Sequence, residues 1–93
     1  DGFNMNWPWE SFNTLFAPGL ATISKYGKPM FIFSFGGAEG DMKAEWLKDA
    51  FEQMEKYPLM EGFIYFNQNK ERNWLLWSDQ ETFEVFTNYV ESL

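Results

Sequence analysis

Apolar residues form two kinds of run along these 93 residues: stripes at helical spacing and short unbroken blocks. The stripes lie in residues 11–26, 41–57 and 78–93, where apolar side chains recur three or four positions apart. The blocks lie at about 29–35 and 60–67. The first contains the unbroken apolar run Met30–Phe33, which is typical of a parallel strand buried on both faces. The pattern predicts an α/β fold with two parallel strands and three helices.

Cap and turn residues predict where the helices begin and end. Pro18 should divide the first helix into two pieces, because proline lacks the backbone N–H that a helix interior needs. Gly27 lies where a C-terminal cap belongs. Asp41 is expected to cap the second helix, and Ser78 with Glu81 forms a predicted capping box for the third.

The predicted connectivity leaves the sheet incomplete. Strand–helix–strand units give parallel strands with right-handed crossovers, yet two strands have two open edges and do not make a stable sheet. We therefore expect residues 1–93 to be a single segment, completed by the rest of a larger barrel or by another chain. A self-sufficient two-stranded domain is the weaker alternative.

Composition excludes several classes of partner and of site. Fourteen acidic residues face seven basic ones, a net charge of −7, so neither nucleic acid nor an anionic membrane is expected as a partner. The chain has no Cys and no His, which excludes disulfides, Cys/His metal sites and histidine-based triads. Aromatic residues reach 22%, more apolar surface than a small domain easily hides, so part of it should meet another chain or a ligand.

Two stretches combine tryptophan with amide side chains. Residues 1–9 and 67–77 are rich in Asn, Gln and Trp, and we expect residues 1–9 to form a loop. Sugar rings stack their apolar faces on aromatic rings, and their hydroxyls bond to amides. A neutral sugar is therefore a candidate ligand, and the alternative is that these tryptophans only anchor their loops.

Four stretches together resemble glycoside hydrolase family 26. They are KPMFIFSFG at 28–36, AEGDMKAEWLKDAFEQM at 38–54, GFIYFNQNKERNW at 62–74 and DGFNMNW at 1–7. The resemblance implies a partial (β/α)8 TIM barrel, from the end of strand six to helix eight, with the active site at the C-terminal ends of the strands. It also implies a secreted or cell-surface protein. We expect neither a metal nor an organic cofactor.

The resemblance fails at the residue that should perform the chemistry. In the family, the glutamate of an EFG motif on strand seven is the nucleophile, and the matching position is Ser34. A serine without a neighbouring base cannot replace the attacking carboxylate of a retaining glycosidase. Phe33 and Phe3 also differ from the family pattern, which favours natural divergence over one engineered change. Glu39 is the nearest other acid, and solvation is its simpler interpretation.

These observations predict a glycan-recognising segment that is catalytically silent or impaired, with a neutral polysaccharide or oligosaccharide as partner. The expected sugar contacts are Asn4, Trp7, Tyr65, Asn67, Trp74 and Trp77, with Tyr65 matching an aromatic residue on the family's last strand. One alternative is a fragment of an active or nucleophile-substituted retaining β-glycanase of the endo-β-mannanase or glucanase type. Another is a structural protein that assembles through exposed strand edges.

Overall fold

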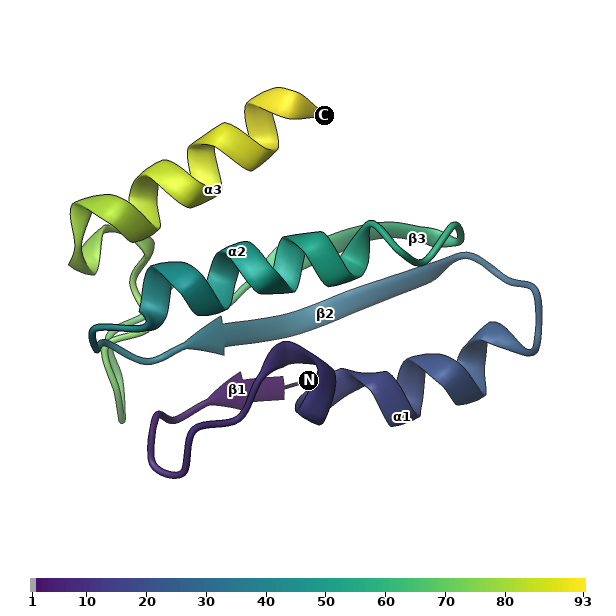
Figure 1. Cartoon of the computed structure of the whole chain (residues 1–93), viewed down its shortest axis with the longest axis horizontal. Coiled ribbons are helices and arrows are strands. Elements are labelled where there is room, and N and C mark those ends of the chain that lie inside the picture. The colour runs from purple at the N-terminus through teal and green to yellow at the C-terminus, as the bar shows by residue number, and fades with distance from the viewer. Residues whose placement is uncertain (1) are drawn as a thin grey trace.

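The structure is a computed structural model that describes residues 2–93 and contains one parallel sheet with three helices (Figure 1). The elements are β1 (Gly2–Asn4), α1 (Phe12–Ser24), β2 (Met30–Gly37), α2 (Lys43–Met54), β3 (Met60–Tyr65), the 3-10 turn η1 (Leu76–Ser78) and α3 (Gln80–Ser92). The strand order is β1-β2-β3, and both pairings are parallel. The predicted α/β class with parallel strands is therefore confirmed.

The predicted number of strands is wrong, and the loop predicted at residues 1–9 is correct only from residue 5 onward. Gly2–Asn4 pairs with Phe35–Gly37 and forms a third strand at the edge of the sheet. Three residues are too few to show an alternating pattern, so tertiary pairing decides this strand. Asp1 lies outside the described residues.

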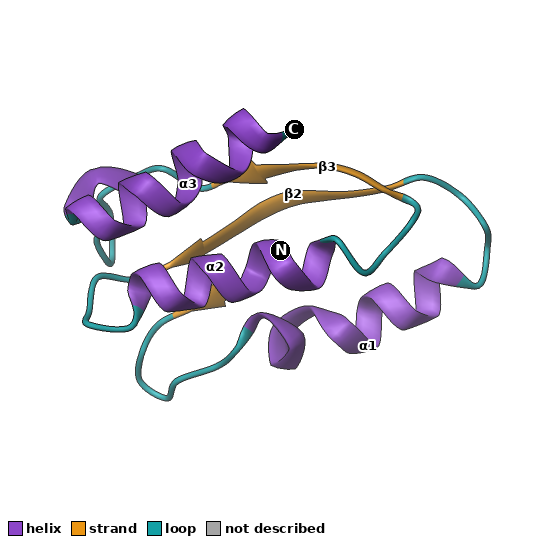
Figure 2. Cartoon of the chain, turned by 45° about the horizontal axis from the view of Figure 1, so that its top comes forward, coloured by secondary structure: helices purple, strands orange, loops and turns teal. Residues whose placement is uncertain are grey.

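All crossovers run in the same direction and place their helices on one face of the sheet. The Phe35 ring on β2 contacts Phe12 of α1 and both Trp46 and Phe51 of α2. Phe86 of α3 contacts Phe63 of β3 on the same side. Figure 2 shows α2 in front of the strands, with α1 beside α2. Within residues 2–93, the helices therefore cover only one face of the sheet.

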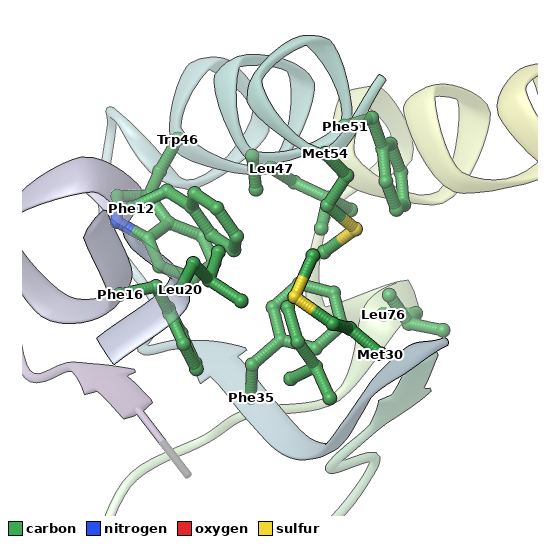
Figure 3. Packing of buried hydrophobic residues seen from close by; sticks show 12 residues of the cluster. Phe12, Phe16, Leu20, Met30, Phe35, Trp46, Leu47, Phe51, Met54 and Leu76 are labelled. Atoms are coloured by element: carbon green, nitrogen blue, oxygen red, sulfur yellow. The ribbon is translucent and has the colours of Figure 1, made fainter. Parts of the chain in front are cut away.

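The hydrophobic core lies between this helical layer and the sheet (Figure 3). The stripe predicted for α2 is confirmed, since Ala44, Leu47, Phe51 and Met54 are all buried. The buried cluster consists of Phe12, Phe16, Leu20, Met30, Ile32, Phe35, Trp46, Leu47, Ala50, Phe51, Met54 and Leu76.

The opposite face of the sheet is bare within residues 2–93. Phe33 is 71% exposed, and Phe31 and Ile64 are also exposed on this face. The expectation that the strand at 29–35 is buried on both sides is therefore wrong for the described residues, because no second layer covers it there. We call the surface formed by Phe31, Phe33 and Ile64 the open face.

β2 contains a bulge next to Ser34. Ile32 pairs with Phe63 and Phe35 pairs with Tyr65, so β2 advances three residues while β3 advances two. Ile32 and Phe35 both belong to the buried core despite their odd spacing. The extra residue is accommodated at Phe33 and Ser34, and bulges of this kind re-aim side chains next to functional sites.

Two predicted caps are displaced by one residue. The N-cap of α2 is Met42, without a side-chain hydrogen bond, whereas the expected Asp41 is exposed. The N-cap of α3 is Asp79, whose carboxylate accepts from the Thr82 N–H at 2.8 Å. Ser78 has a different partner, described below, and this is why the predicted capping box with Glu81 does not form.

The first helix is continuous through Pro18, contrary to the prediction of two pieces. Pro18 is exposed, so the carbonyl that it leaves unbonded one turn earlier lies toward water. Gly27 ends this region with a φ of +63°, as predicted for a glycine after a helix.

The apolar stripe predicted for α3 is buried only in part. Phe86 packs against the core, but Phe83, Val90 and Leu93 are exposed. α3 packs on α2 and η1, which leaves its other flank without a neighbour within the described residues.

Candidate binding site at the strand ends

Three loops meet at the C-terminal ends of the strands, on the left of Figure 1. They are residues 5–11 after β1, residues 38–42 after β2, and residues 66–79 after β3. The middle loop is hydrogen-bonded to both of the others. The Asn and Trp residues singled out in the sequence therefore belong to one connected end of the molecule.

Asn4 shapes the first loop. Its side chain is fully buried, its Oδ1 accepts from the Asn6 N–H at 3.2 Å and the Glu10 N–H at 2.9 Å, and its Nδ2 donates to Asn6 Oδ1 at 3.1 Å. Asn6, at a φ of +68°, donates through Nδ2 to the carbonyls of Ala38 at 3.0 Å and Glu39 at 2.6 Å. Asn4 thus positions a loop instead of presenting an amide to solvent.

Glu39 connects the middle loop with the third. Its Oε2 accepts a 2.6 Å hydrogen bond from the Asn73 N–H. Asn73 Oδ1 in turn accepts from the Leu75 N–H at 3.1 Å. The carboxylate of Glu39 is therefore engaged with the main chain and is more than a solvated surface charge.

Lys43 holds the same loop from the first turn of α2. Its Nζ donates to the carbonyls of Asn73 at 3.2 Å and Leu75 at 2.5 Å, and to Ser78 Oγ at 2.7 Å. Burial lowers the pKa of this amine to about 8, and the negative charges of Asp79 and Glu39 partly offset that effect.

Tyr65, the last residue of β3, is hydrogen-bonded to the loop 66–79. Its ring packs on the helical side, against Phe35 and Phe86, and its hydroxyl donates to the Trp74 carbonyl at 2.7 Å. Burial raises the pKa of this phenol to about 12. The sequence placed Tyr65 under a sugar, but in the structure its ring is turned toward the core.

An aromatic cluster fills the strand ends on the side away from the helices. The Phe3 ring lies 5.5 Å from that of Phe66 and 5.2 Å from that of Trp74, between centroids. Trp74 is only 3% exposed, and a Cβ built on Gly36 would lie 3.6 Å from its ring. Within residues 2–93, the Trp74 ring therefore has little exposed surface that a ligand could contact.

Two tryptophans of the predicted set do face solvent. Trp7 is 87% exposed on the first loop, and Trp77 is 59% exposed in η1. Asn67 is half-buried, and its Oδ1 accepts from the Leu76 N–H at 2.8 Å. The exposed rings of Trp7 and Trp77 thus belong to loops whose main chain is hydrogen-bonded by the side-chain amides of Asn4 and Asn67.

Sequence reasoning missed Phe66, Asn73 and Lys43. Lys43 gave a detectable signal, because it lies three and four residues before Trp46 and Leu47 and hence on the apolar stripe of α2. Phe66 could have been found from strand alternation. It follows Tyr65, whose ring lies on the helical side, so its own ring should lie on the opposite face of the sheet.

The arrangement offers binding groups but few reactive ones. Ser34 Oγ has no hydrogen-bond partner that would activate it within residues 2–93, and the nearest acid in sequence, Glu39, is bonded to Asn73. Over the same residues, no three acidic side chains come together in a geometry that would hold a metal ion.

A groove of about 640 Å³ lies elsewhere, between α2 and α3. Its lining includes Phe51 and Tyr89, from the C-terminal halves of these helices, and Glu55, which follows α2. The strands run antiparallel to these helices, so the groove is remote from the strand ends and is not part of the candidate site.

The chain is similar to part of a known protein. No family model matches the chain. The chain is 29% identical over 98 residues to Endoglucanase H of Acetivibrio thermocellus, and the match covers 97% of the chain. It spans 11% of the length of that relative. This similarity supports a distant relationship to a glycoside hydrolase.

None of the helices within residues 2–93 combines the length and the apolarity needed to cross a lipid bilayer.

Proposed function

We propose that this chain is a sector of a glycoside-hydrolase-like (β/α)8 barrel that recognises a neutral glycan and is catalytically silent or impaired. The observation that carries the proposal is Ser34, which lies at the bulge of the central strand where the family 26 resemblance requires the nucleophilic glutamate. By the same likeness, we propose that the protein is secreted or displayed at the cell surface.

The winding of the sheet supports a barrel. Consecutive strands are neighbours, all crossovers move in one direction, and the helices cover one face. A doubly wound sheet would reverse its strand order and place helices on both faces. A barrel instead keeps one direction and fills its interior with strand side chains. Phe31, Phe33 and Ile64 on the open face are then interior residues, and the free edges of β1 and β3 pair with further strands.

The exposed tryptophans support glycan recognition. Trp7 and Trp77 lie on loops after β1 and β3, at the end of the strands where barrels bind substrates. Flat, uncharged ring surfaces suit the apolar faces of sugars, and Asn67 lies in the same loop as Trp77. Asn4, Tyr65 and Trp74 have a supporting role in this proposal, because each is buried or turned toward the core.

The missing nucleophile supports a silent site. A retaining mechanism needs two carboxyl groups about 5 Å apart. Ser34 supplies none, and Phe33 and Phe3 also depart from the pattern of the active family. The aromatic cluster at the strand ends consists of Phe3, Phe66 and Trp74, none of which carries a carboxyl group.

Calorimetric titration of the full-length protein with manno- and gluco-oligosaccharides tests recognition. We expect Trp7→Ala and Trp77→Ala each to weaken binding about tenfold, or about 1.4 kcal/mol. Tyr26→Ala is the matched control, because Tyr26 is an exposed aromatic residue at the opposite end of the sheet. Absence of heat with every oligosaccharide, in a protein that is shown to be folded, would reject glycan recognition.

A retaining β-glycanase with a substituted nucleophile is the alternative from the enzyme class. It predicts that Ser34→Glu restores hydrolysis by several orders of magnitude in the full-length protein. Our proposal expects this variant to remain near background, since Phe33 and Phe3 also depart from the active pattern.

An assembly role is favoured by a different observation, the exposure of Phe31, Phe33 and Ile64 beside unpaired strand edges. Such edges pair with other chains when nothing covers them. Light scattering at micromolar concentration decides between an assembly role and a closed barrel. Oligomers or filaments of the full-length protein would favour assembly, and a monomer would favour a closed barrel.

A further inference from the structure

Lys43 makes an unusual set of contacts for a lysine. The residue is 1% exposed, although lysine is rarely fully buried. Its ammonium has three N–H donors, and the three oxygen atoms that it contacts belong to Asn73, Leu75 and Ser78. All three lie in the loop 66–79, and they bracket Trp74 and Trp77 in the sequence.

Helix formation does not explain a lysine at this place. Lys43 is the first residue of α2, where the helix dipole disfavours a positive charge. Its three hydrogen-bond partners are uncharged, and a buried charge without a direct counter-ion costs free energy. The charged groups that act on the amine are Asp79 at the start of α3 and Glu39 in the loop before α2.

We propose that Lys43 is a positioning residue that fixes the loop 66–79 in the shape that presents Trp77 to a glycan. The proposal rests on the proposed function, in which Trp77 is a sugar platform. Glu39 secures the same loop at the Asn73 N–H, so the two charged side chains hold its main chain from both ends of the 39–43 segment.

The chemistry of the contacts explains why a neutral side chain would not suffice. Two of the acceptors are main-chain carbonyls of half-buried residues. Without the ammonium, the Asn73 carbonyl would lose its donor, and the Leu75 carbonyl would keep only the Ser78 N–H at 3.2 Å. An unsatisfied buried carbonyl is costly, so the loop is expected to turn these groups toward water. That movement would carry Trp74, the residue between them, away from the strand ends.

Amide hydrogen exchange of the full-length Lys43→Met protein tests the proposal. We expect protection of the amides in loop 66–79 to fall at least tenfold, while the amides of β2 and of the middle of α2 keep theirs. Lys48→Met is the matched control, since Lys48 is an exposed lysine on the same helix. Unchanged protection of the loop in Lys43→Met would overturn the proposal.

Restoring the charge separates a positioning role from simple packing. Residues 1–93 contain no cysteine, so Lys43→Cys can be alkylated there with 2-bromoethylamine in the unfolded state, which rebuilds a lysine-like ammonium. Recovery of loop protection after refolding supports the proposal. Failure to recover, in a refolded protein with native protection elsewhere, contradicts it.

A milder variant covers the case in which Lys43→Met does not fold. Ser78→Ala removes one of the three acceptors and leaves the ammonium in place. We expect a several-fold loss of protection confined to the same loop, and no local change would count against the proposal. If the wild-type protein binds no glycan, the proposed function fails, whereas the exchange results still decide whether Lys43 positions the loop.

Discussion

The Tyr65 hydroxyl donates a 2.7 Å hydrogen bond to the main-chain carbonyl of Trp74, so the last strand directly supports the loop that follows it. The Gly37 N–H donates to the same hydroxyl at 3.3 Å, which adds the end of β2 to the contact. One phenol therefore joins two strands and a loop at the end of the sheet where we place the ligand.

Tyr65→Phe should reveal the strength of this junction. The ring remains in the core, but the Trp74 carbonyl and the Gly37 N–H lose a partner, so we expect a loss of about 1 to 2 kcal/mol in the free energy of unfolding. Urea titration followed by tryptophan fluorescence measures it. Tyr89→Phe is the control, because its hydroxyl bonds to Glu55 at an exposed site and should matter less. Equal losses in both variants would contradict the expectation.

Asp79→Ala tests which residue begins α3. Asp79 accepts from the Thr82 N–H at 2.8 Å and from Thr82 Oγ1 at 2.9 Å, and loss of such a cap costs about 1 kcal/mol. Glu81→Ala serves as comparison, since the sequence assigned Glu81 to a capping box that the structure lacks. It should change stability by less than about 0.5 kcal/mol. Thermal unfolding that ranks the two variants in the reverse order would restore the sequence-based cap.

Two glycine substitutions should have opposite effects. A Cβ on Gly2 would lie 2.5 Å from the buried ring of Phe16, so Gly2→Ala should destabilise the protein by about 1 to 3 kcal/mol. A Cβ on Gly19 meets nothing within 4 Å, and this residue lies inside α1. Gly19→Ala should therefore stabilise the protein by about 0.5 to 1 kcal/mol. Calorimetric melting temperatures that move in the same direction would show that one of these environments is described wrongly.

Stability should pass through a maximum near pH 10. Burial lowers the pKa of Lys43 from 10.5 to about 8 in the folded protein, so between these values the unfolded chain binds more protons and the free energy of unfolding rises with pH. Burial raises the pKa of Tyr65 from 10.0 to about 12, and partial burial together with the hydrogen bond to the Glu55 carboxylate raises that of Tyr89 to the same value. Above about pH 10 the unfolded chain loses these phenolic protons first, and stability falls.

Denaturant titrations across this pH range provide the measurement. Lys43→Met should remove the rise above pH 8, and Tyr65→Phe should reduce the fall above pH 10. A wild-type profile that decreases steadily from pH 8 would mean that the amine of Lys43 is not desolvated in solution.

The sequence predicted the repeating helix–strand order well, because each of these elements has a characteristic spacing of apolar residues along the chain. Leu47, Phe51 and Met54 lie at helical spacing, and the run Met30–Phe33 has no polar interruption, so neighbours in the chain are enough to identify both. β1 could not be found in this way. Its three residues become a strand only through pairing with Phe35–Gly37, more than thirty positions away.

The candidate site was predicted less completely, because exposure depends on contacts between distant loops. Trp74 and Trp77 are alike in the sequence, yet Phe3 and Phe66 cover the first and leave the second exposed. Lys43 was hidden for the opposite reason. A charged residue on an apolar stripe can be noticed, but its acceptors at Asn73, Leu75 and Ser78 are set by tertiary folding.

The bulge in β2 has a consequence for how the chemistry of this position could change over time. The place of Ser34 in the sheet depends on the number of residues between Ile32 and Phe35, and not on which residues they are. Point mutation at residue 34 can therefore exchange a hydroxyl for a carboxylate, or the reverse, without moving the backbone that carries it. A deletion at 33 or 34 would instead remove the extra residue and shift the following side chains, Phe35 among them, out of register. The bulge thus separates changes of the functional group at residue 34, which a substitution can make, from changes of the strand's register, which need an insertion or a deletion.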